Sequence, residues 1–270
     1  MAGQHVQLRV FFSGRIFESH PLTILNAPSP VSCISSGELI LGARVAGDWT
    51  RALNEVALQE QKTHRMSVMM DGPYGGSTID IGEYESVLLV AGGSGATFTV
   101  GLLDDIVGRV VNMERKGGER TERIEFAWYI KSFGRHRIPL VSNNFHFVPL
   151  GSISWFSPML LDIANKAQSS SLNLHIQIFV TCLCDPEAVP IIPNCDISIE
   201  KPKVAQLLEP LLTPHTDVET KAGRGDGGVA VAVSGPESLA WEAQNVVARI
   251  AAGKAKRVGG LALHTDIFSL

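Results

Sequence analysis

The chain has 270 residues, a formal net charge of −4 at pH 7 and a pI near 6.1. Hydrophobic residues make up 45% of it and charged residues 19%, which is typical of a globular protein with a large core and excludes a disordered chain. The slightly acidic balance argues against nucleic acid or an anionic membrane surface as a partner. This length allows two domains of ordinary size or one large domain.

The four cysteines lack the C-x-x-C spacing and the paired histidines of common metal sites. Their spacing predicts neither a zinc site nor a disulfide framework, and it fits a reducing compartment. The chain also shows no N-terminal targeting signal and no apolar run of roughly 18 residues that could span a bilayer. By itself, the chain is therefore expected to be cytoplasmic. The cysteines are Cys33, Cys182, Cys184 and Cys195.

The first third of the chain predicts short strands and a single small helix. Residues 5–12 alternate polar and apolar side chains, as a half-buried strand does. Short strands with one small helix, for which Asp48 is the candidate N-cap, are typical of a small antiparallel barrel. Because residues 5–12 have almost no lead-in, we expect a further piece of the barrel to precede Met1. The other elements are expected at 15–30 (a strand broken at His20-Pro21), 37–45 (strand), 48–59 (helix) and 65–70, before a turn-rich hinge at 71–76.

A buried strand, a glycine-rich turn and a helix succeed one another between Tyr84 and Val111. Residues 87–91 are an uninterrupted apolar run, and apolar side chains recur at helical spacing after Thr97. This arrangement directs free backbone N–H groups and the positive end of a helix at a phosphate, and glycine allows a pyrophosphate to come close. The spacing is not a strict G-x-G-x-x-G, so a packed turn with no ligand stays an alternative. The turn consists of Gly92, Gly93, Ser94, Gly95, Ala96 and Thr97.

From Ser86 onward, strands alternate with helices, which predicts a parallel sheet covered by helices. Residues 213–228 predict a surface loop. Residues 135–150 are too long for a β–α connection of about 2–6 residues, so we interpret them as an insertion, such as translated intron sequence. Strands are expected at 86–91, 123–130, 174–181, 195–199, 229–233 and 258–263, and helices at 95–112, 153–168, 202–212 and 237–252.

Four motifs occur in a fixed order along the chain. They are His20-Pro21-Leu22-Thr23-Ile24, Gly72-Pro73-Tyr74-Gly75, the glycine turn at 92–97 and Ser234-Gly235-Pro236. In this order and spacing, and together with residues 2–12, they resemble the flavin- and nicotinamide-binding part of fungal ferric reductases. Those proteins belong, with the NADPH oxidases, to the ferredoxin–NADP reductase superfamily. The resemblance covers nearly the whole chain except 135–150 and 213–228.

The resemblance implies an α/β fold, in which a doubly wound parallel sheet binds NADP and a truncated antiparallel β-barrel in front of it binds FAD. It places the barrel at residues 1–82 and the NADP-binding domain at 83–270. The implied cofactors are FAD and NADPH. Haem belongs to a membrane domain that the full-length family carries in the plasma membrane and that is absent from this chain, whose residues would lie on the cytoplasmic side.

For the flavin, the resemblance assigns residues of the barrel, the hinge and the C-terminus. Thr23 is the candidate for the isoalloxazine contact and for a catalytic role, and His20 is the candidate for the phosphate side. Leu22 stands where the family usually has Phe. Taken singly, His20 and Thr23 can also be a satisfied histidine and strand filler, Gly72-Pro73 an ordinary turn and Phe268 a core residue. The set on this side, with a dinucleotide contact at the hinge, is His20, Pro21, Leu22, Thr23, Gly72, Pro73, Tyr74, Gly75 and Phe268.

For the nicotinamide, the resemblance assigns the turn after the strand at 229–233. Ser234 is the second catalytic candidate. The family often has Cys there, so we expect slower hydride transfer, not its loss. Lys131 ends the strand at 123–130, where no Asp or Glu is available for a free 2′-hydroxyl, which favours NADPH over NADH. Lys131 as plain surface charge, and Lys201 as a second phosphate contact, stay open. The set on this side is Gly92, Gly93, Ser94, Gly95, Thr97, Lys131, Ser234, Gly235 and Pro236.

These assignments predict a module that passes a hydride from NADPH to FAD, for onward one-electron reduction of haem and ferric iron. A superoxide-generating NADPH oxidase-type module differs only in its electron acceptor and stays an alternative. A truncated, non-catalytic fragment is the other alternative, because a barrel without its first strands exposes an unpaired edge.

Overall fold

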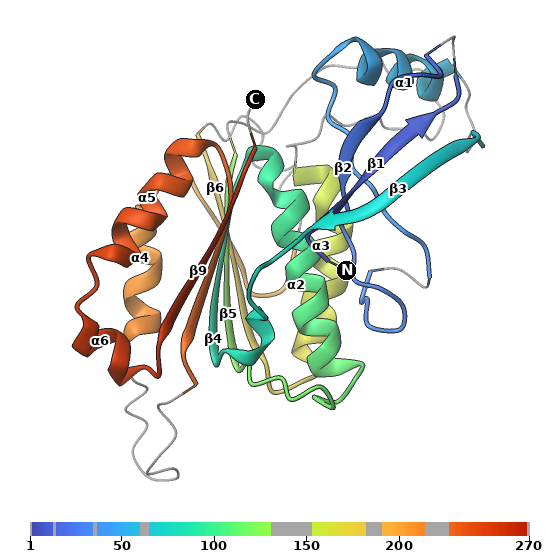
Figure 1. Ribbon diagram of the computed structural model, residues 1–270. Coiled ribbons are helices and arrows are strands. Elements are labelled where there is room, and N and C mark those ends of the chain that lie inside the picture. The colour runs from blue at the N-terminus through green and yellow to red at the C-terminus, as the bar shows by residue number, and fades with distance from the viewer. Residues whose placement is uncertain are drawn as a thin grey trace.

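Two sheets make up the fold in Figure 1, which shows a computed structural model of the chain. The structure describes residues 2–12, 15–34, 37–59, 65–130, 153–181, 191–213 and 227–268. The insertion predicted at 135–150 lies outside these residues, as do Lys131 and most of the loop predicted at 213–228. Among the described helices, none has both the length and the apolarity needed to cross a bilayer.

The larger sheet has six strands in the order β7-β6-β5-β4-β8-β9, and all neighbouring pairs are parallel. The chain runs outward from β4 to β7 and then returns to the other side of β4 for β8 and β9. This reversal places the carboxyl ends of β4 and β8 side by side, where ligands bind in open α/β sheets. The strands are β4 (Ser86–Gly92), β5 (Arg123–Ile130), β6 (Asn173–Val180), β7 (Cys195–Ser198), β8 (Val229–Gly235) and β9 (Leu261–Ile267).

Helices cover both faces of the six-stranded sheet (Figure 1). One face carries two long helices, which pack with β4, β5 and β6 into one apolar cluster. The other face carries three shorter helices and a second cluster. The first two are α2 (Ala96–Val111) and α3 (Ile153–Gln168), and the other three are α4 (Val204–Leu208), α5 (Glu237–Ala248) and α6 (Ala252–Arg257).

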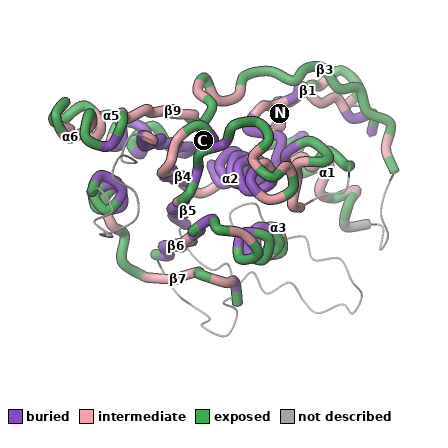
Figure 2. The backbone as a smooth tube through the Cα atoms, turned by 90° about the horizontal axis from the view of Figure 1, so that it is seen from below, coloured by how far each residue is buried: buried purple, intermediate pink, exposed green. Residues whose placement is uncertain are grey.

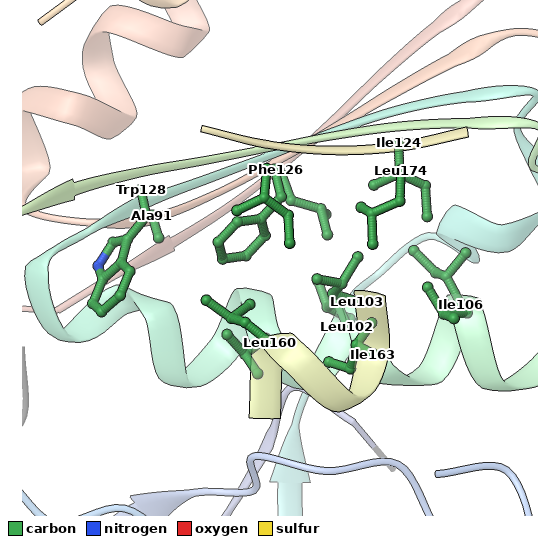
Figure 3. Close-up of a cluster of buried hydrophobic side chains, with 14 of the residues drawn as sticks. Ala91, Leu102, Leu103, Ile106, Ile124, Phe126, Trp128, Leu160, Ile163 and Leu174 are labelled. Carbon is green, nitrogen blue, oxygen red and sulfur yellow. The ribbon is translucent and has the colours of Figure 1, made fainter. Parts of the chain in front are cut away.

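Large apolar side chains fill the layer between the sheet and α2 and α3 (Figure 3). Phe126 and Trp128 point from β5 into this layer and are fully buried, as are Leu103 of α2 and Leu160 of α3. Burying a side chain of this size stabilises a fold by roughly 1.5–3 kcal/mol. The apolar runs predicted as strands therefore form a sheet that is buried on both faces.

The smaller sheet has three antiparallel strands in the order β2-β1-β3. Its middle strand is β1 (Gln4–Val10), between β2 (His20–Thr23) and β3 (Val68–Gly75). The helix α1 (Asp48–Gln59) packs on this sheet through Trp49, in a small apolar cluster with Val10 and Phe12. An antiparallel sheet followed by a doubly wound parallel sheet confirms the predicted fold class. The division of the chain at residue 82 stays a prediction.

The helix α2 lies between the two sheets. Figure 2 shows it buried along most of its length, with β4 on one side and the N-terminal segment on the other. Its Asp104 is fully buried, and the carboxylate accepts hydrogen bonds from the Ala27 N–H (2.7 Å), the Ser32 hydroxyl (2.7 Å) and the Cys33 N–H (2.6 Å). Asp104 therefore ties the segment that follows β2 to the parallel-sheet part of the molecule.

The strand predicted at 37–45 is wrong. Within it, only Leu41 forms a bridge, to Ile24. The buried side chain of Asn26 hydrogen-bonds to backbone groups that a neighbouring strand would otherwise bind. Its amide donates to the Glu38 carbonyl (2.8 Å), and its oxygen accepts from the Ile40 N–H (2.8 Å). A side chain thus replaces a strand neighbour, and the segment follows β2 without joining the sheet.

Several predicted boundaries also differ from the structure, and most of the turn-rich hinge predicted at 71–76 belongs to the strand β3. The helix predicted at 237–252 ends at Ala248, and a separate helix α6 begins at Ala252. The last strand begins at Leu261 and not at residue 258, because Gly259 and Gly260 before it adopt positive φ angles of 84° and 117°. The helix predicted at 202–212 is α4 followed by a 3₁₀ turn. Asp48 is the first helical residue of α1 and not its N-cap, since the Arg51 N–H already bonds to the Gly47 carbonyl.

Candidate functional site

The turn after β4 packs against the turn after β8. A Cβ atom built on Gly95 would lie 2.1 Å from the carbonyl oxygen of Ser234, so no larger residue fits there. A Cβ atom on Gly92 would lie 2.7 Å from Cδ of Pro236. Gly95 is therefore required by a contact with the backbone of Ser234, and Gly92 by a contact with the ring of Pro236. The alternative of a packed turn explains them well.

Gly93 differs from its neighbours. Its φ angle of +55° favours glycine, and no heavy atom of the described residues lies within 4 Å of the position of its Cβ. Its carbonyl accepts a 2.9 Å hydrogen bond from Nε1 of Trp128, which holds the turn from inside. The helix α2 begins directly after this turn, with no described side chain capping it. Its first N–H groups and its positive end can therefore hold an anion such as a phosphate beside Gly93.

The motif after β8 brings Ser234 and Phe268 close together. The Phe268 N–H donates to the Gly235 carbonyl (3.0 Å), which extends the pairing of β8 and β9 by one step. Ser234 is 0% exposed, and within the described part of the chain its hydroxyl has no hydrogen-bond partner. An unpaired buried hydroxyl costs roughly 1–3 kcal/mol. This group therefore has unused donor and acceptor capacity at the switch point, the place between β4 and β8 where the strand order reverses.

On the smaller sheet, His5 of β1 joins the two predicted flavin motifs. Its Cα pairs with that of Thr23 on β2 and with that of Tyr74 on β3. The rings of His5 and Tyr74 lie 6.0 Å apart, and the Tyr74 hydroxyl donates to Asp71 (2.7 Å). Two motifs about fifty residues apart in the sequence are thus adjacent in one row across the three strands.

Asp266 of β9 lies beside Ser234, near the carboxyl end of β8. It pairs in register with Ser234. Burial raises the pKa of the Asp266 carboxyl, and the nearby imidazoles of His264 and His5 act in the opposite direction. His264 in turn stacks on Phe98 of α2 with ring centroids 5.4 Å apart, and burial lowers its pKa. Thr23, His5 and Tyr74 are thus in register on the smaller sheet, and Ser234 and Asp266 are in register on the parallel sheet.

His20 lies at the other end of β2, beside the start of α1. Its ring stacks on the indole of Trp49 at a centroid distance of 4.3 Å, and its Nε2 lies 3.5 Å from a carboxylate oxygen of Glu18. Pro21 is exposed, and Leu22 and Thr23 are half-buried. The hinge residues Gly72, Pro73, Tyr74 and Gly75 are all exposed on β3.

A cation lies over an aromatic pair at the carboxyl ends of β5 and β6. Nζ of Lys201 is 5.3 Å from the centroid of the Tyr129 ring, which stacks on Phe179 at 5.1 Å. The Tyr129 hydroxyl donates to the Pro202 carbonyl (2.9 Å), and burial raises the pKa of this tyrosine. Lys201 is therefore held at the end of the strand that precedes Lys131.

The residues missed in the sequence are those whose position depends on pairing across strands. His5, Trp49, His264 and Asp266 were not singled out, although each contacts a predicted residue or its neighbour. Two signals were available. His5 and His264 are the histidines nearest to the two ends of the chain, and Trp49 follows the first residue of a predicted helix.

Comparisons with known proteins identify relatives of this chain. Residues 1–78 match a family described as an FAD-binding domain. Respiratory burst oxidase homolog protein D of Solanum tuberosum is 27% identical over 184 residues, covering 59% of this chain and 19% of that protein. Ferric reductase transmembrane component 5 of Saccharomyces cerevisiae is 31% identical over 131 residues, covering 48% and 17%. The chain thus spans less than a fifth of the length of these curated relatives.

Solved structures share the fold of the whole chain. A ferredoxin reductase in carbazole 1,9a-dioxygenase has a TM-score of 0.54 at 13% identity, over 100% of this chain and 60% of that one. A ferredoxin NADP+ reductase from Neisseria gonorrhoeae, with bound FAD and NADP, has a TM-score of 0.53 at 12% identity, over 98% and 86%. At these identities, the likeness shows a common arrangement of two sheets.

Proposed function

We propose that this chain is the flavin and nicotinamide module of the group of flavoproteins that contains ferric reductases and respiratory burst oxidases, which its motifs resemble and its relatives represent. Its reaction is hydride transfer from NADPH to FAD. The observation that supports this best is the match of residues 1–78 to an FAD-binding domain, in front of a parallel sheet whose helix α2 begins at the open turn at Gly93. The bound cofactors supply the redox chemistry, as a hydride given by nicotinamide C4 to flavin N5.

On the nicotinamide side, the chain binds and orients. Gly93 and the N-terminus of α2 fit a pyrophosphate, because the turn is open there and the helix end is uncapped within the described residues. Ser234 can offer its unused hydroxyl to a carboxamide. Lys201 is suited to a 2′-phosphate, since the Tyr129 ring beneath it fixes its position. Lys131 stays a second candidate for the same phosphate.

On the flavin side, the strands of the smaller sheet supply the contacts. Thr23 is the proposed polar contact of the isoalloxazine, with the hinge at Gly72–Gly75 across β1 from it, and His20 is the proposed contact of the pyrophosphate. Phe268 is proposed to lie against the flavin, since its backbone is fixed to Gly235.

The electrons then pass to an acceptor outside this chain. We propose a haem-bearing membrane domain in the plasma membrane as the partner, with this module on the cytoplasmic side and ferric iron as the final acceptor, in keeping with the yeast relative. A superoxide-generating oxidase is the second candidate, and the match to the respiratory burst oxidase homolog favours it.

Flavin loading of the purified chain tests this proposal. We expect the full chain, mixed with FAD and passed through a desalting column, to retain a yellow colour that NADPH bleaches without oxygen. A chain that stays colourless contradicts the proposal and favours the non-catalytic fragment. Comparing ferric-chelate reduction without oxygen with superoxide formation in air then separates the two acceptors.

The choice of nicotinamide is tested at Lys201. Lys201→Ala is expected to raise the NADPH concentration for half-maximal flavin reduction roughly tenfold and to leave the NADH value unchanged, because one charge-assisted contact to a phosphate is lost. Lys116→Ala, on an exposed side chain far from the strand ends, is the matched control. Equal effects on both nucleotides would assign the 2′-phosphate contact elsewhere, with Lys131 next to be replaced.

A further inference from the structure

The pair formed by His20 and Trp49 has an unusual distribution of exposure. Trp49 is 3% exposed, with Phe12 against its edge at a centroid distance of 6.1 Å. The side chain of His20 is 38% exposed and lies on the indole with an interplanar angle of 30°. The buried indole of Trp49, packed against the core of the smaller sheet, therefore lies beneath the partly exposed imidazole of His20.

Neither ring of this pair is held by a hydrogen bond within the described residues. Nε1 of Trp49 and Nε2 of His20 are both buried there and make no hydrogen bond. The carboxylate of Glu18, 3.5 Å from Nε2, is an ion-pair contact only. Since Nε2 is buried, the exposed area of His20 belongs to the rest of its side chain. The stack on Trp49, together with Glu18, thus decides which edge of the imidazole faces outward.

A simple packing role does not explain the choice of tryptophan. Its buried N–H remains unpaired within the described residues, which costs roughly 1–3 kcal/mol, and an aliphatic side chain would fill the cluster around Val10 and Leu53 without this cost. What tryptophan adds is a flat π face, which holds an imidazole at stacking distance and attracts it more strongly when it is protonated.

We propose that Trp49 is a positioning residue, which holds His20 so that its outward edge meets the pyrophosphate of FAD. This inference rests on the proposed function. The ligand group is a pyrophosphate because the proposed function assigns the phosphate side of FAD to His20, whose imidazole can donate a hydrogen bond to a phosphate oxygen. Trp49 itself acts through His20 and does not touch the cofactor.

The test compares three variants of the full chain by their FAD dissociation constants. Trp49→Leu and His20→Ala are each expected to weaken FAD binding roughly tenfold, because each loses one charge-assisted contact. The double variant is expected to bind FAD no more weakly than either single variant, since both remove the same contact. Trp49→Phe keeps an aromatic face and is expected to stay within roughly threefold of the wild type. Trp241→Leu, at a tryptophan that is 56% exposed on α5, is the matched control.

The position of His20 is read independently of FAD. In protein prepared without flavin, the ring protons of His20 should show the ring-current shift of a stacked indole in NMR spectra, and Trp49→Leu should abolish it. If Trp49→Leu binds FAD like the wild type, or if its effect adds fully to that of His20→Ala, the positioning role is wrong. If the wild type shows the shift yet binds no FAD, it is the proposed function that fails.

Discussion

The two sheets of the molecule differ in what covers them. In the parallel sheet, residues 87–91 of β4 are 0% exposed, because helices lie on both faces. In the smaller sheet, every residue of β3 is exposed, and Val68, Met69 and Met70 keep more than half of their surface in solvent. No other described strand pairs with the outer edge of β3. The parallel sheet thus carries its own core, whereas the smaller sheet depends on α1 and on its attachment to α2.

Gly95→Ala should destabilise the parallel sheet more than any other change proposed here. The new methyl group would meet the Ser234 carbonyl at 2.1 Å, so the turns after β4 and β8 would have to separate. We expect a loss of about 3 kcal/mol or more in the free energy of unfolding, measured by urea denaturation. Gly253→Ala in α6, where a Cβ atom meets nothing within 4 Å, is the control. A loss below about 1 kcal/mol would show that the two turns are not in contact.

Asp104→Ala should detach the smaller sheet and leave the parallel sheet folded. It removes the acceptor of three hydrogen bonds, from the buried Ala27 and from the half-buried Ser32 and Cys33, at a cost of roughly 2–4 kcal/mol. Hydrogen exchange is expected to accelerate at residues 25–33 and in β1, with little change in β4. Glu55→Gln on the exposed side of α1 is the control. Uniform acceleration in both sheets would contradict the difference drawn here between them.

The exposed edge of the parallel sheet should respond to pH through His175. Burial lowers the pKa of this imidazole, but its hydrogen bonds to Asp196 of β7 and Glu125 of β5 outweigh burial and raise it above 6.5. A raised pKa means that the stabilising contribution is complete below about pH 6.5 and is lost as the pH rises through the folded-state value.

His175→Gln should remove this dependence. The contribution is expected to stay under about 1 kcal/mol, because the ring keeps contact with solvent. Urea unfolding at several pH values between about 5.5 and 8.5 would show wild type and variant converging at the alkaline end. Parallel curves over the whole range would exclude a protonated His175 between the two carboxylates.

Ser234→Cys should give the smallest change, and only in rate. The side chain is fully buried at the switch point, and Cys has nearly the same volume, so the unfolding free energy is expected to stay within about 0.5 kcal/mol. Flavin reduction by NADPH is expected to become roughly threefold faster, which is about 0.6 kcal/mol of barrier. Stopped-flow absorbance of the flavin measures this rate. An unchanged rate would remove Ser234 from the catalytic candidates.

The sequence predicts the parallel sheet better than it predicts the smaller sheet and its surroundings. The strands of the parallel sheet are apolar runs bounded by helices, and burial on both faces makes such runs readable, as with residues 87–91 and 229–233. The segment at 37–45 was misjudged because the side chain of Asn26 supplies the contacts of a strand, which no local pattern reveals. His5 was missed because its role depends on its register with Thr23 and Tyr74. The four motifs predict the site, and only pairing across strands shows their neighbours.

The hydrogen bond from the Trp128 indole to the Gly93 carbonyl makes the fluorescence of Trp128 a probe of the glycine turn. The indole is 0% exposed and touches Phe156 edge-on, so its emission is expected at short wavelength, undisturbed by solvent. A nucleotide bound at Gly93 would polarise that carbonyl from the outer side and so shift the emission wavelength of Trp128 without contacting its indole. In a chain whose other tryptophans are replaced, the colour of Trp128 would then report occupancy of the turn in real time.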